Sequence, residues 1–217
     1  SNFGGDFAHM MKRTGYDAIV ITGKSPGPSY ISINDGKIQI KGAEKIWGKR
    51  TSDSHKALVE MEKQKVESAV IGPAGENQVV FANIICSGKR VSAAGRCGFG
   101  AVFGSKNLKG ITVFGNTQND IYDPEKLKKL QKENFQTLKE NTGVFTKYGT
   151  PVLVNILNEK GMLPTKNCTR ETFDKANNIS GETIEENYKT KNTACNGCPV
   201  ACGKMVKVTS GSFSGQE

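Results

Sequence analysis

Three cysteines near the end of the chain form the pattern with the clearest chemistry. Cys195, Cys198 and Cys202 are spaced C-x2-C-x3-C, which allows three thiolates to bind one iron–sulfur cluster. Zinc is the competing metal, but zinc sites usually combine two C-x2-C pairs or cysteines with histidines. The two histidines of this chain, His9 and His55, lie far upstream. The spacing therefore predicts a [4Fe-4S] cluster in an electron-transferring protein.

This set of ligands is one short, because a [4Fe-4S] cluster normally has four. Cys168 could supply the fourth ligand, or the fourth ligand could lie beyond Glu217. We favour the second reading, because the chain begins without an initiator methionine and stops in a loop-like segment, as an internal piece of a longer protein would. Cys86, Cys97 and Cys168 are isolated in the sequence, and each is expected to be a small buried or half-buried packing residue.

A glycine-rich basic segment, residues 88–109, is the second candidate site. Its small residues let a ligand approach the backbone amides, and Arg90, Arg96 and nearby lysines supply charge for phosphate. The segment matches neither a Walker loop nor a dinucleotide fingerprint. It suggests a phosphorylated cofactor, with plain tight turns between short strands as the alternative.

Composition narrows the class of protein. The 217 residues carry a formal net charge of +9, and 36% of them are hydrophobic, which is enough for an ordinary core. The charge favours anionic partners, such as phosphorylated cofactors or an acidic redox protein. Nucleic acid is not expected, because the lysines are spread along the chain. No apolar run approaches the ~20 residues of a membrane span, and no signal peptide is visible, so we expect a cytoplasmic protein.

The first half of the chain, residues 1–115, is predicted to be β-rich with a few helices. Hydrophobic periodicity predicts helices over 5–14 and 51–65, with Leu58 and Met61 of the second facing inward. Thr51, Ser52 or Asp53 is available as the cap of that helix, and His55 is expected on its polar surface. Strands are predicted at 18–22, 30–33, 37–40, 69–71, 79–81, 101–103 and 111–114, with a turn at 34–36.

The second half, residues 116–217, is predicted to be mainly helical. Asp123 and Pro124 begin a long helix that runs to about residue 140. Its expected buried stripe consists of Leu127, Leu130, Phe135 and Leu138. A second helix is expected over 149–161, and helices and loops to the end. The fold class is therefore α+β, with one domain over 1–115 and another over 116–217 that carries the cysteines.

A series of motifs in the same order resembles the aldehyde ferredoxin oxidoreductase family. They extend over essentially the whole chain, and their shared order argues against chance. The motifs are GYDAIV at 15–20, IWGK at 46–49, IGPAGEN at 71–77, AGR at 94–96, GSKNLK at 104–109, KYGT at 147–150 and the cysteine triplet.

The resemblance implies a tungsten enzyme, less often a molybdenum enzyme, in which two pterins hold the metal beside a [4Fe-4S] cluster. The usual reaction of the family oxidises an aldehyde to a carboxylic acid with water and passes two electrons through the cluster to ferredoxin. A β-rich N-terminal pterin-binding base domain lies under the site, and helical domains cover it. The implied partners are a small aldehyde and ferredoxin or a ferredoxin-like electron-transfer subunit, with a homodimer left open and no membrane.

The resemblance also assigns site residues. Cys195, Cys198 and Cys202 match the clustered iron ligands, and Arg96 is placed to meet cofactor phosphate or cluster sulfur. The positions that match the two pterin-contacting turns are Asn2, Gly4, Ala93, Gly95 and Arg96.

Two departures from the family loop concern its charge and its chemistry. Arg90 is displaced by two positions, which leaves its role open, and Cys97 replaces a glycine. We expect Cys97 to be an inert residue. The alternatives are an extra metal ligand and a reactive thiol. No catalytic acid or base can be named: these residues and the fourth cluster ligand are expected after Glu217, so the chain alone should be inactive.

Two other functions are kept open. The first is a reductase of the same family acting on aromatic acyl-coenzyme A or on carboxylic acids, since the same cofactor base serves both reactions. The second is an electron-transfer or zinc-binding module that uses only the cysteine motif. The second alternative leaves the β-rich first half without a role.

Overall fold

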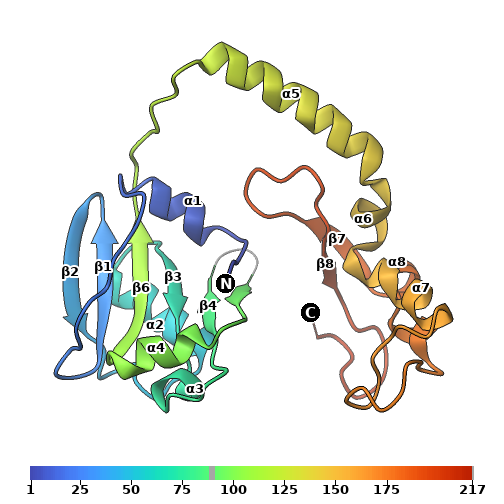
Figure 1. Cartoon of the computed structure of the whole chain (residues 1–217), viewed down its shortest axis with the longest axis horizontal. Helices are drawn as coiled ribbons and strands as arrows, with labels where there is room; N and C mark the ends of the chain where they lie inside the picture. The colour runs from blue at the N-terminus through green and yellow to red at the C-terminus, as the bar shows by residue number, and fades with distance from the viewer. Residues whose placement is uncertain (88–90, 217) are drawn as a thin grey trace. The chain divides into compact units, whose positions relative to one another are not determined.

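The computed structural model describes residues 1–87 and 91–216. The chain divides into two compact units, Ser1–Ile121 and Tyr122–Glu217 (Figure 1). Gly88, Lys89 and Arg90, the start of the predicted anion-binding segment, lie outside the described residues.

A six-stranded mixed sheet forms the centre of the first unit (Figure 1). Its strand order is β2-β1-β6-β3-β4-β5. The β1–β6 pair is parallel, and the other neighbours are antiparallel. The strands are β1 Ser29–Asn34, β2 Lys37–Gly42, β3 Glu67–Val70, β4 Ile84–Cys86, β5 Ser92–Ala94 and β6 Leu108–Phe114.

The predicted hairpin is confirmed. Asp35 and Gly36 connect β1 to β2 with φ values of 44° and 80°, as expected for a two-residue turn that matches the twist of the strands. The strands predicted at 69–71 and 111–114 are confirmed as β3 and β6.

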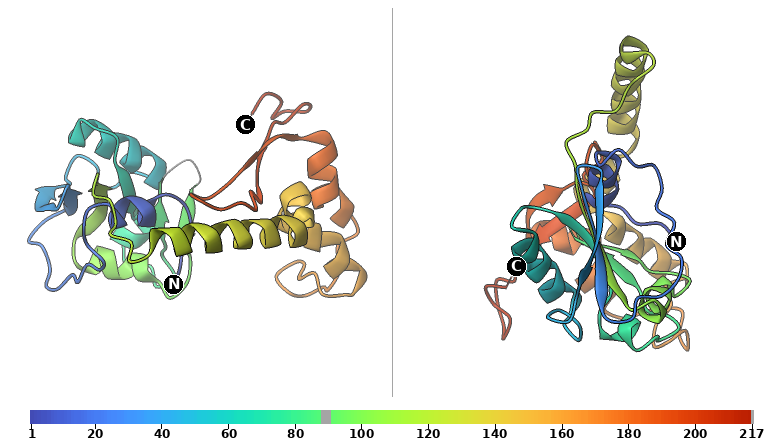
Figure 2. Two further views of the ribbon diagram at one scale, coloured as in Figure 1. Left: turned by 90° about the horizontal axis from the view of Figure 1, so that it is seen from above. Right: turned by 90° about the vertical axis from the view of Figure 1, so that its left-hand side faces the viewer.

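Helices cover both faces of the sheet, because successive residues of a strand point to opposite sides. On one face, Ile33 and Ala69 pack in a cluster with Phe7 of α1 (Phe7–Lys12). On the other face, Val70 packs in a cluster with Leu58 of α2 (Thr51–Glu62). The view on the right of Figure 2 shows α2, in teal, to one side of the sheet. Both helices were predicted, but α2 has no side-chain cap from its first residues.

The strands predicted at 101–103 and 79–81 are not formed. The first of these segments is a helix that packs closely against the backbone of neighbouring segments. Residues 101–103 belong to α4 (Phe99–Ser105), which lies against α3 (Pro73–Glu76). A Cβ on Gly104 would be 1.8 Å from the Gly75 carbonyl oxygen, and a Cβ on Gly100 would be 2.7 Å from that of Asn83. Because residues four apart lie on the same side of a helix, Gly100 and Gly104 leave one face of α4 without side chains, and this face contacts the backbone. Residues 79–81 form a turn between these contacts.

The strand predicted at 18–22 is also wrong. Ile19 and Ile21 pack partly against the core next to α1, whereas Val20 is 87% exposed. The alternation of apolar side chains is real, but it anchors an irregular segment to the core. Alternating apolar residues indicate that one side of an extended segment is buried. They do not by themselves show that the segment pairs with another strand.

A buried ion pair joins three segments of the first unit. The side chains of Lys109 on β6 and Glu76 on α3 are 0% and 5% exposed and contact each other. Lys109 Nζ also donates to the carbonyl oxygen of Lys49 at 2.9 Å, and the Gly48 amide donates to Glu76 Oε2 at 2.8 Å. Burial lowers the pKa of Lys109, and the Glu76 carboxylate opposes that shift. Three of the family-like motifs therefore meet at one buried contact.

The second unit is mainly helical but contains one hairpin that the sequence reading missed, β7 paired with β8. No helix among the described residues is long and apolar enough to cross a membrane. The elements are α5 Pro124–Asn141, α6 Gly143–Tyr148, η1 Thr150–Val152, α7 Leu153–Glu159, η2 Ala176–Ile179, α8 Gly181–Asn187, β7 Lys189–Thr193 and β8 Gly203–Val206.

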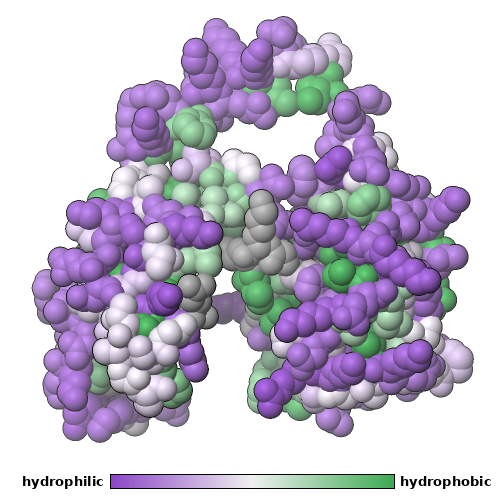
Figure 3. Space-filling view, turned by 180° about the vertical axis from the view of Figure 1, so that it is seen from behind, coloured by the Kyte–Doolittle hydropathy of each residue, from purple (hydrophilic) through white to green (hydrophobic). Residues whose placement is uncertain are grey.

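Helix α5 was predicted correctly in extent but not in burial. Asp123 caps it by accepting a hydrogen bond from the Lys126 amide at 2.9 Å. The helix has no buried residue, and its apolar stripe is 37% to 53% exposed. The surface in Figure 3 is mainly hydrophilic, in keeping with the lysine-rich composition. Helical periodicity shows which side of a helix is apolar, but not what covers it.

We expect Lys109→Met to lower the free energy of unfolding of the first unit by roughly 3–5 kcal/mol, because it leaves the Glu76 carboxylate buried without a cation. Urea unfolding followed by the fluorescence of Trp47, the single tryptophan, measures this. Lys12→Met is the control, because it breaks an exposed pair with Asp17 and should cost less than about 1 kcal/mol. If Lys109→Met and Lys12→Met lowered the free energy of unfolding by equally small amounts, the stabilising role of the Lys109–Glu76 ion pair would be contradicted.

Candidate functional site

The three predicted iron ligands lie in one loop, between β7 and β8. The hairpin brings Thr193 opposite Gly203 and so closes the loop on both sides of the cysteines. Within it, the amide of Cys198 donates to the carbonyl oxygen of Cys195 at 3.0 Å. The side chains of Cys195, Cys198 and Cys202 are all half-buried thiols. The structure therefore places Cys195 and Cys198 on one hydrogen-bonded turn and Cys202 at the end of the same loop, next to β8.

Helix α6 holds this loop from one side. Thr146 Oγ1 donates to the carbonyl oxygen of Val200 at 2.8 Å, and Lys204 Nζ donates to the Thr146 carbonyl oxygen at 2.8 Å. Gly149 follows with φ of 70°, and a Cβ there would be 2.8 Å from the Cys202 carbonyl oxygen. The KYGT motif thus needs its glycine for the close approach to the cysteine loop.

A lysine of β8 lies beside the loop. The pKa of Lys204 is lowered by burial and by the neighbouring Lys189, while Glu185 and then Cys202 oppose the shift. The thiolate is the form of cysteine that binds metal. The donor chemistry of the loop, three thiols beside an ammonium group, therefore fits an iron–sulfur cluster.

The sulfurs do not converge on a common point, however. Across residues 1–87 and 91–216, the structure gathers no group of three or more His, Cys, Asp or Glu side chains that could hold a metal ion. Metal binding and local folding are coupled, because ligand thiols lose their protons as they bind. The assignment of Cys195, Cys198 and Cys202 as iron ligands stays a prediction.

The isolated cysteines differ from one another. Cys86 is buried as predicted, and burial raises the pKa of its thiol to about 12, which makes it inert. Cys97 and Cys168 are exposed, so the prediction of half-buried packing residues is wrong for both. Their φ values of 68° and 62° lie in the left-handed region, where glycine is the least strained residue. This explains why the family-like loop has a glycine at the position of Cys97.

The structure joins the two predicted pterin-contacting turns. The amide of Arg96 donates to Ser1 Oγ at 3.3 Å. Asn2, Gly4 and Arg96 are exposed, and Phe3 between the first two packs edge-on against Phe7, with ring centroids 5.8 Å apart. The turn at the start of the chain is therefore anchored by the Phe3 ring, while Asn2 and Gly4 on either side of Phe3 are exposed.

The loop that carries Arg96 is also open to a ligand. Ala93 and Gly95 are exposed, and a Cβ built on Gly95 would have its nearest neighbours, the Ala93 carbonyl oxygen and Asn83 Nδ2, at 4.0 Å. Exposed backbone beside a guanidinium group suits a phosphorylated cofactor. These residues therefore fit a pterin chemically, and their assignment as its contacts remains a prediction.

A polar chain through the sheet was not predicted. His55, expected on a polar surface, is half-buried, and its Nδ1 is 2.8 Å from Ser68 Oγ. Ser68 Oγ donates to Ser87 Oγ at 3.4 Å, and Ser87 Oγ donates to Glu67 Oε2 at 3.3 Å. Glu67, Ser68 and Ser87 are all buried. The only sign in the sequence is a Glu-Ser pair at the start of an apolar strand, which would not have identified the partners.

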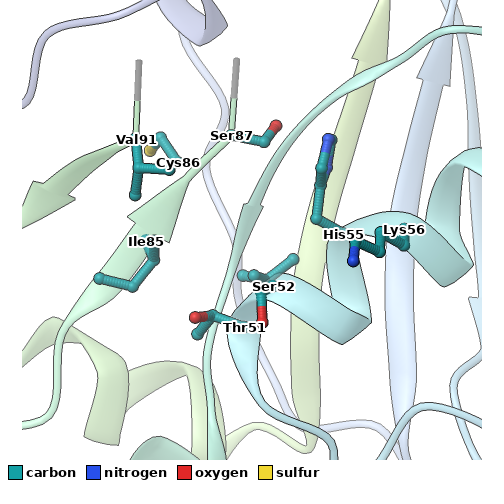
Figure 4. Close-up of a pocket in the computed structure, with 9 residues that line it drawn as sticks. Thr51, Ser52, His55, Lys56, Ile85, Cys86, Ser87 and Val91 are labelled. Atoms are coloured by element: carbon teal, nitrogen blue, oxygen red, sulfur yellow. The ribbon is translucent and has the colours of Figure 1, made fainter. Parts of the chain in front are cut away.

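The chain of polar groups opens at His55 into a cavity of about 210 Å³. Figure 4 shows the His55 ring rising from α2 toward the end of β4, where Ser87 lies. Burial lowers the pKa of His55. Burial raises the pKa of Glu67, with a contribution from Asp6, while Ser87 and Lys65 oppose that shift.

The comparisons with known proteins cover both units. The model of "Aldehyde ferredoxin oxidoreductase, N-terminal domain" matches residues 1–115, and that of "Aldehyde ferredoxin oxidoreductase, domains 2 & 3" matches residues 125–217. Tungsten-containing aldehyde ferredoxin oxidoreductases are 44% identical in Pyrococcus abyssi and 43% identical in Pyrococcus furiosus. These matches cover 94% and 100% of this chain, and 34% and 36% of the relatives. The chain thus spans about a third of their length.

A solved structure is also similar, the active site complex BamBC of benzoyl coenzyme A reductase with 1,5-dienoyl-CoA. The TM-score is 0.72 at 26% identity, over 95% of this chain and 33% of that one. The similarity therefore extends to an enzyme whose name indicates a different reaction.

We expect the free energy of unfolding of the first unit to fall as the pH drops below 6.5, the ordinary pKa of histidine. Because the pKa of His55 is lowered in the folded state, the unfolded chain binds a proton that the folded chain refuses. The free energy of unfolding should change with pH by well below about 1.4 kcal/mol per pH unit, the slope for a difference of one bound proton between the unfolded and folded states. The reason is that the His55 ring is only half-buried.

Urea unfolding around neutral pH and at about pH 5.5 measures this change. His55→Gln should remove it, whereas His9→Gln, at an exposed position, should keep it. Glu67 acts in the opposite sense, because its raised pKa gives stability that is present below 4.5 and lost as the pH rises through the folded-state value. The difference between His55→Gln and the unaltered protein isolates the histidine, and identical curves would contradict the prediction.

Proposed function

Because this chain belongs to the aldehyde ferredoxin oxidoreductase family, we propose that it is part of an enzyme that oxidises aldehydes to carboxylic acids at a tungsten site held by two pterins. Molybdenum is the alternative metal. The observation that carries the proposal is the similarity to tungsten-containing aldehyde ferredoxin oxidoreductases, which runs across both units of the chain.

In this proposal the first unit binds the pterin. Asn2 and Gly4 on one turn, and Ala93 and Gly95 on the other, let the cofactor lie against exposed backbone. Arg96 binds its phosphate through charge-assisted hydrogen bonds. Support comes from the hydrogen bond between Arg96 and Ser1, which keeps the two turns together.

The second unit would hold the [4Fe-4S] cluster through Cys195, Cys198 and Cys202. The bound tungsten–pterin group supplies a two-electron oxidation, and the cluster passes the electrons on singly. The fourth ligand is Cys168 or a residue elsewhere in the full-length enzyme.

The proposed electron acceptor is ferredoxin or a ferredoxin-like subunit. The net charge of +9 favours an acidic redox protein, because complementary charge speeds the encounter of two proteins. Salt should therefore slow the transfer between the two.

Reduction of an aromatic acyl-coenzyme A is the second candidate. It is supported by the similarity to the BamBC complex of benzoyl coenzyme A reductase, and the lower identity to that structure places it second.

Metal analysis and turnover of the purified holoenzyme separate the candidates. We expect tungsten in the protein, and reduction of a viologen dye with formation of a carboxylate when small aldehydes are supplied. Neither tungsten nor molybdenum in the preparation would sink the proposal. A metal-loaded enzyme that is silent with every aldehyde but active with an aromatic acyl-coenzyme A would instead establish the second candidate.

We expect Cys198→Ser to remove most of the cluster, because a serine oxygen replaces one soft ligand. Iron and acid-labile sulfide should fall from about four of each per chain. Cys97→Ser is the control, an exposed thiol in the first unit, and should retain both. Full iron and sulfide in Cys198→Ser would remove this residue from the ligand set. A loss in Cys168→Ser would identify the fourth ligand.

A further inference from the structure

We propose that the hydrogen-bonded chain Glu67–Ser87–Ser68–His55 carries protons from the pterin side of the first unit to the cavity beside α2. The inference rests on the proposed function, since each aldehyde and water would yield a carboxylic acid, two protons and two electrons. The electrons leave through the cluster to ferredoxin. The protons need a separate route, one at a time.

The chain of polar groups runs from one face of the sheet to the other at the start of β3 and just after the end of β4. Glu67 shares the face of Ala69, which packs in the cluster of α1, whereas Ser68 shares the face of Val70, which packs in the cluster of α2. Ser87, just after β4, contacts both through its hydroxyl group. A single hydroxyl at the end of the strands thus joins the two faces.

The inner end of the chain of polar groups lies near the predicted pterin turn at residues 2–4. Glu67 interacts electrostatically with Asp6, which is the N-cap of α1 and comes directly after Gly4 and Gly5. A proton released at the cofactor would therefore meet Glu67 as a nearby buried base.

The outer end is the His55 ring. It lines the cavity of about 210 Å³ together with Ser87, Lys56 and Cys86 (Figure 4). This volume is large enough for several waters, each of which occupies about 30 Å³ in the liquid. The second ring nitrogen, Nε2, can release its proton to such a water while Nδ1 stays bonded to Ser68.

The transfer balances as a relay. Protonated Glu67 gives its proton to Ser87 Oγ, Ser87 gives its own to Ser68 Oγ, and Ser68 gives its own to His55 Nδ1. His55 then releases the proton of Nε2 to the cavity, and Glu67 is again a carboxylate. In the structure both hydroxyls point toward Glu67, which is their arrangement after a transfer. The next cycle requires the two hydroxyls to turn round and His55 to return from the tautomer protonated on Nδ1 to the one protonated on Nε2. Ser87 has a second acceptor for this rotation, the Ser68 carbonyl oxygen at 3.2 Å.

Burial shifts the pKa values of the two ends of the relay toward each other. It raises the pKa of Glu67 and lowers that of His55, so the free-energy difference between the two protonated forms becomes smaller. The charged groups that face the relay among the described residues are Asp6 and Lys65 at Glu67, and Lys56 at the cavity. Matched acid and base make proton transfer efficient.

Ser87→Ala tests the relay in the holoenzyme. We expect kcat for aldehyde oxidation with a viologen dye to fall roughly tenfold or more with KM unchanged. Ser87→Thr, which keeps the hydroxyl, should retain most of the rate. His55→Gly should be equally slow and should recover when imidazole is added, because the cavity can hold it. His9→Gln is the control at the exposed histidine.

A second readout does not depend on turnover. Glu67→Gln should shift the NMR titration of the His55 ring in the full chain and leave that of His9 in place, and the shift should shrink when Ser87→Ala is added. An unchanged kcat in Ser87→Ala, or no rescue of His55→Gly, overturns the relay while the proposed function stands. If the unaltered enzyme oxidises no aldehyde, the proposed function fails, and an unshifted His55 titration separately overturns the relay.

Discussion

The contact between the buried Lys109 ammonium and the Glu76 carboxylate determines how the first unit is assembled. It joins β6 to α3 and, through the Gly48 amide and the Lys49 carbonyl, to the segment that leads into α2. Helix α3 in turn supports α4, which follows the loop of Arg96. A buried ion pair is costly unless both charges are satisfied, and here each charge has a further hydrogen bond to the segment of Gly48 and Lys49. The segment bonded to the pair leads into α2, which carries His55.

The two predicted cofactor sites are built in different ways. The pterin turns are exposed backbone at one side of a packed sheet, where small residues admit a ligand. The cysteine loop is a turn closed by a short hairpin and held by α6, with its sulfurs not yet gathered. A preformed cradle suits a large organic cofactor, whereas thiols can gather round a cluster because metal binding supplies the free energy of ordering.

The proposals assign electrons and protons to different units. Electrons would leave through the thiolates of the second unit, and protons through the buried hydroxyls of the first. Separate routes suit the two particles, because a proton moves along hydrogen bonds whereas an electron needs only a nearby redox centre. The contacts of 3.4 and 3.3 Å between Ser87 Oγ and the oxygens of Ser68 and Glu67 have to shorten for a proton to cross them. The polar chain at Glu67 is satisfied internally, as buried polar groups must be, and this gives it a structural role as well.

Local chemistry in the sequence by itself determined the β1–β2 hairpin through Asp35 and Gly36, the extent of α5, the order of the family motifs and the candidate ligands. Tertiary structure decided whatever depends on a distant neighbour. Residues 101–103 became a helix because Gly100 and Gly104 lie on other backbone, and His55 left the surface because Ser68 faces it. The physical reason is range: turn and cap preferences act within a few residues, while burial and charge pairing need partners that only the folded chain brings together.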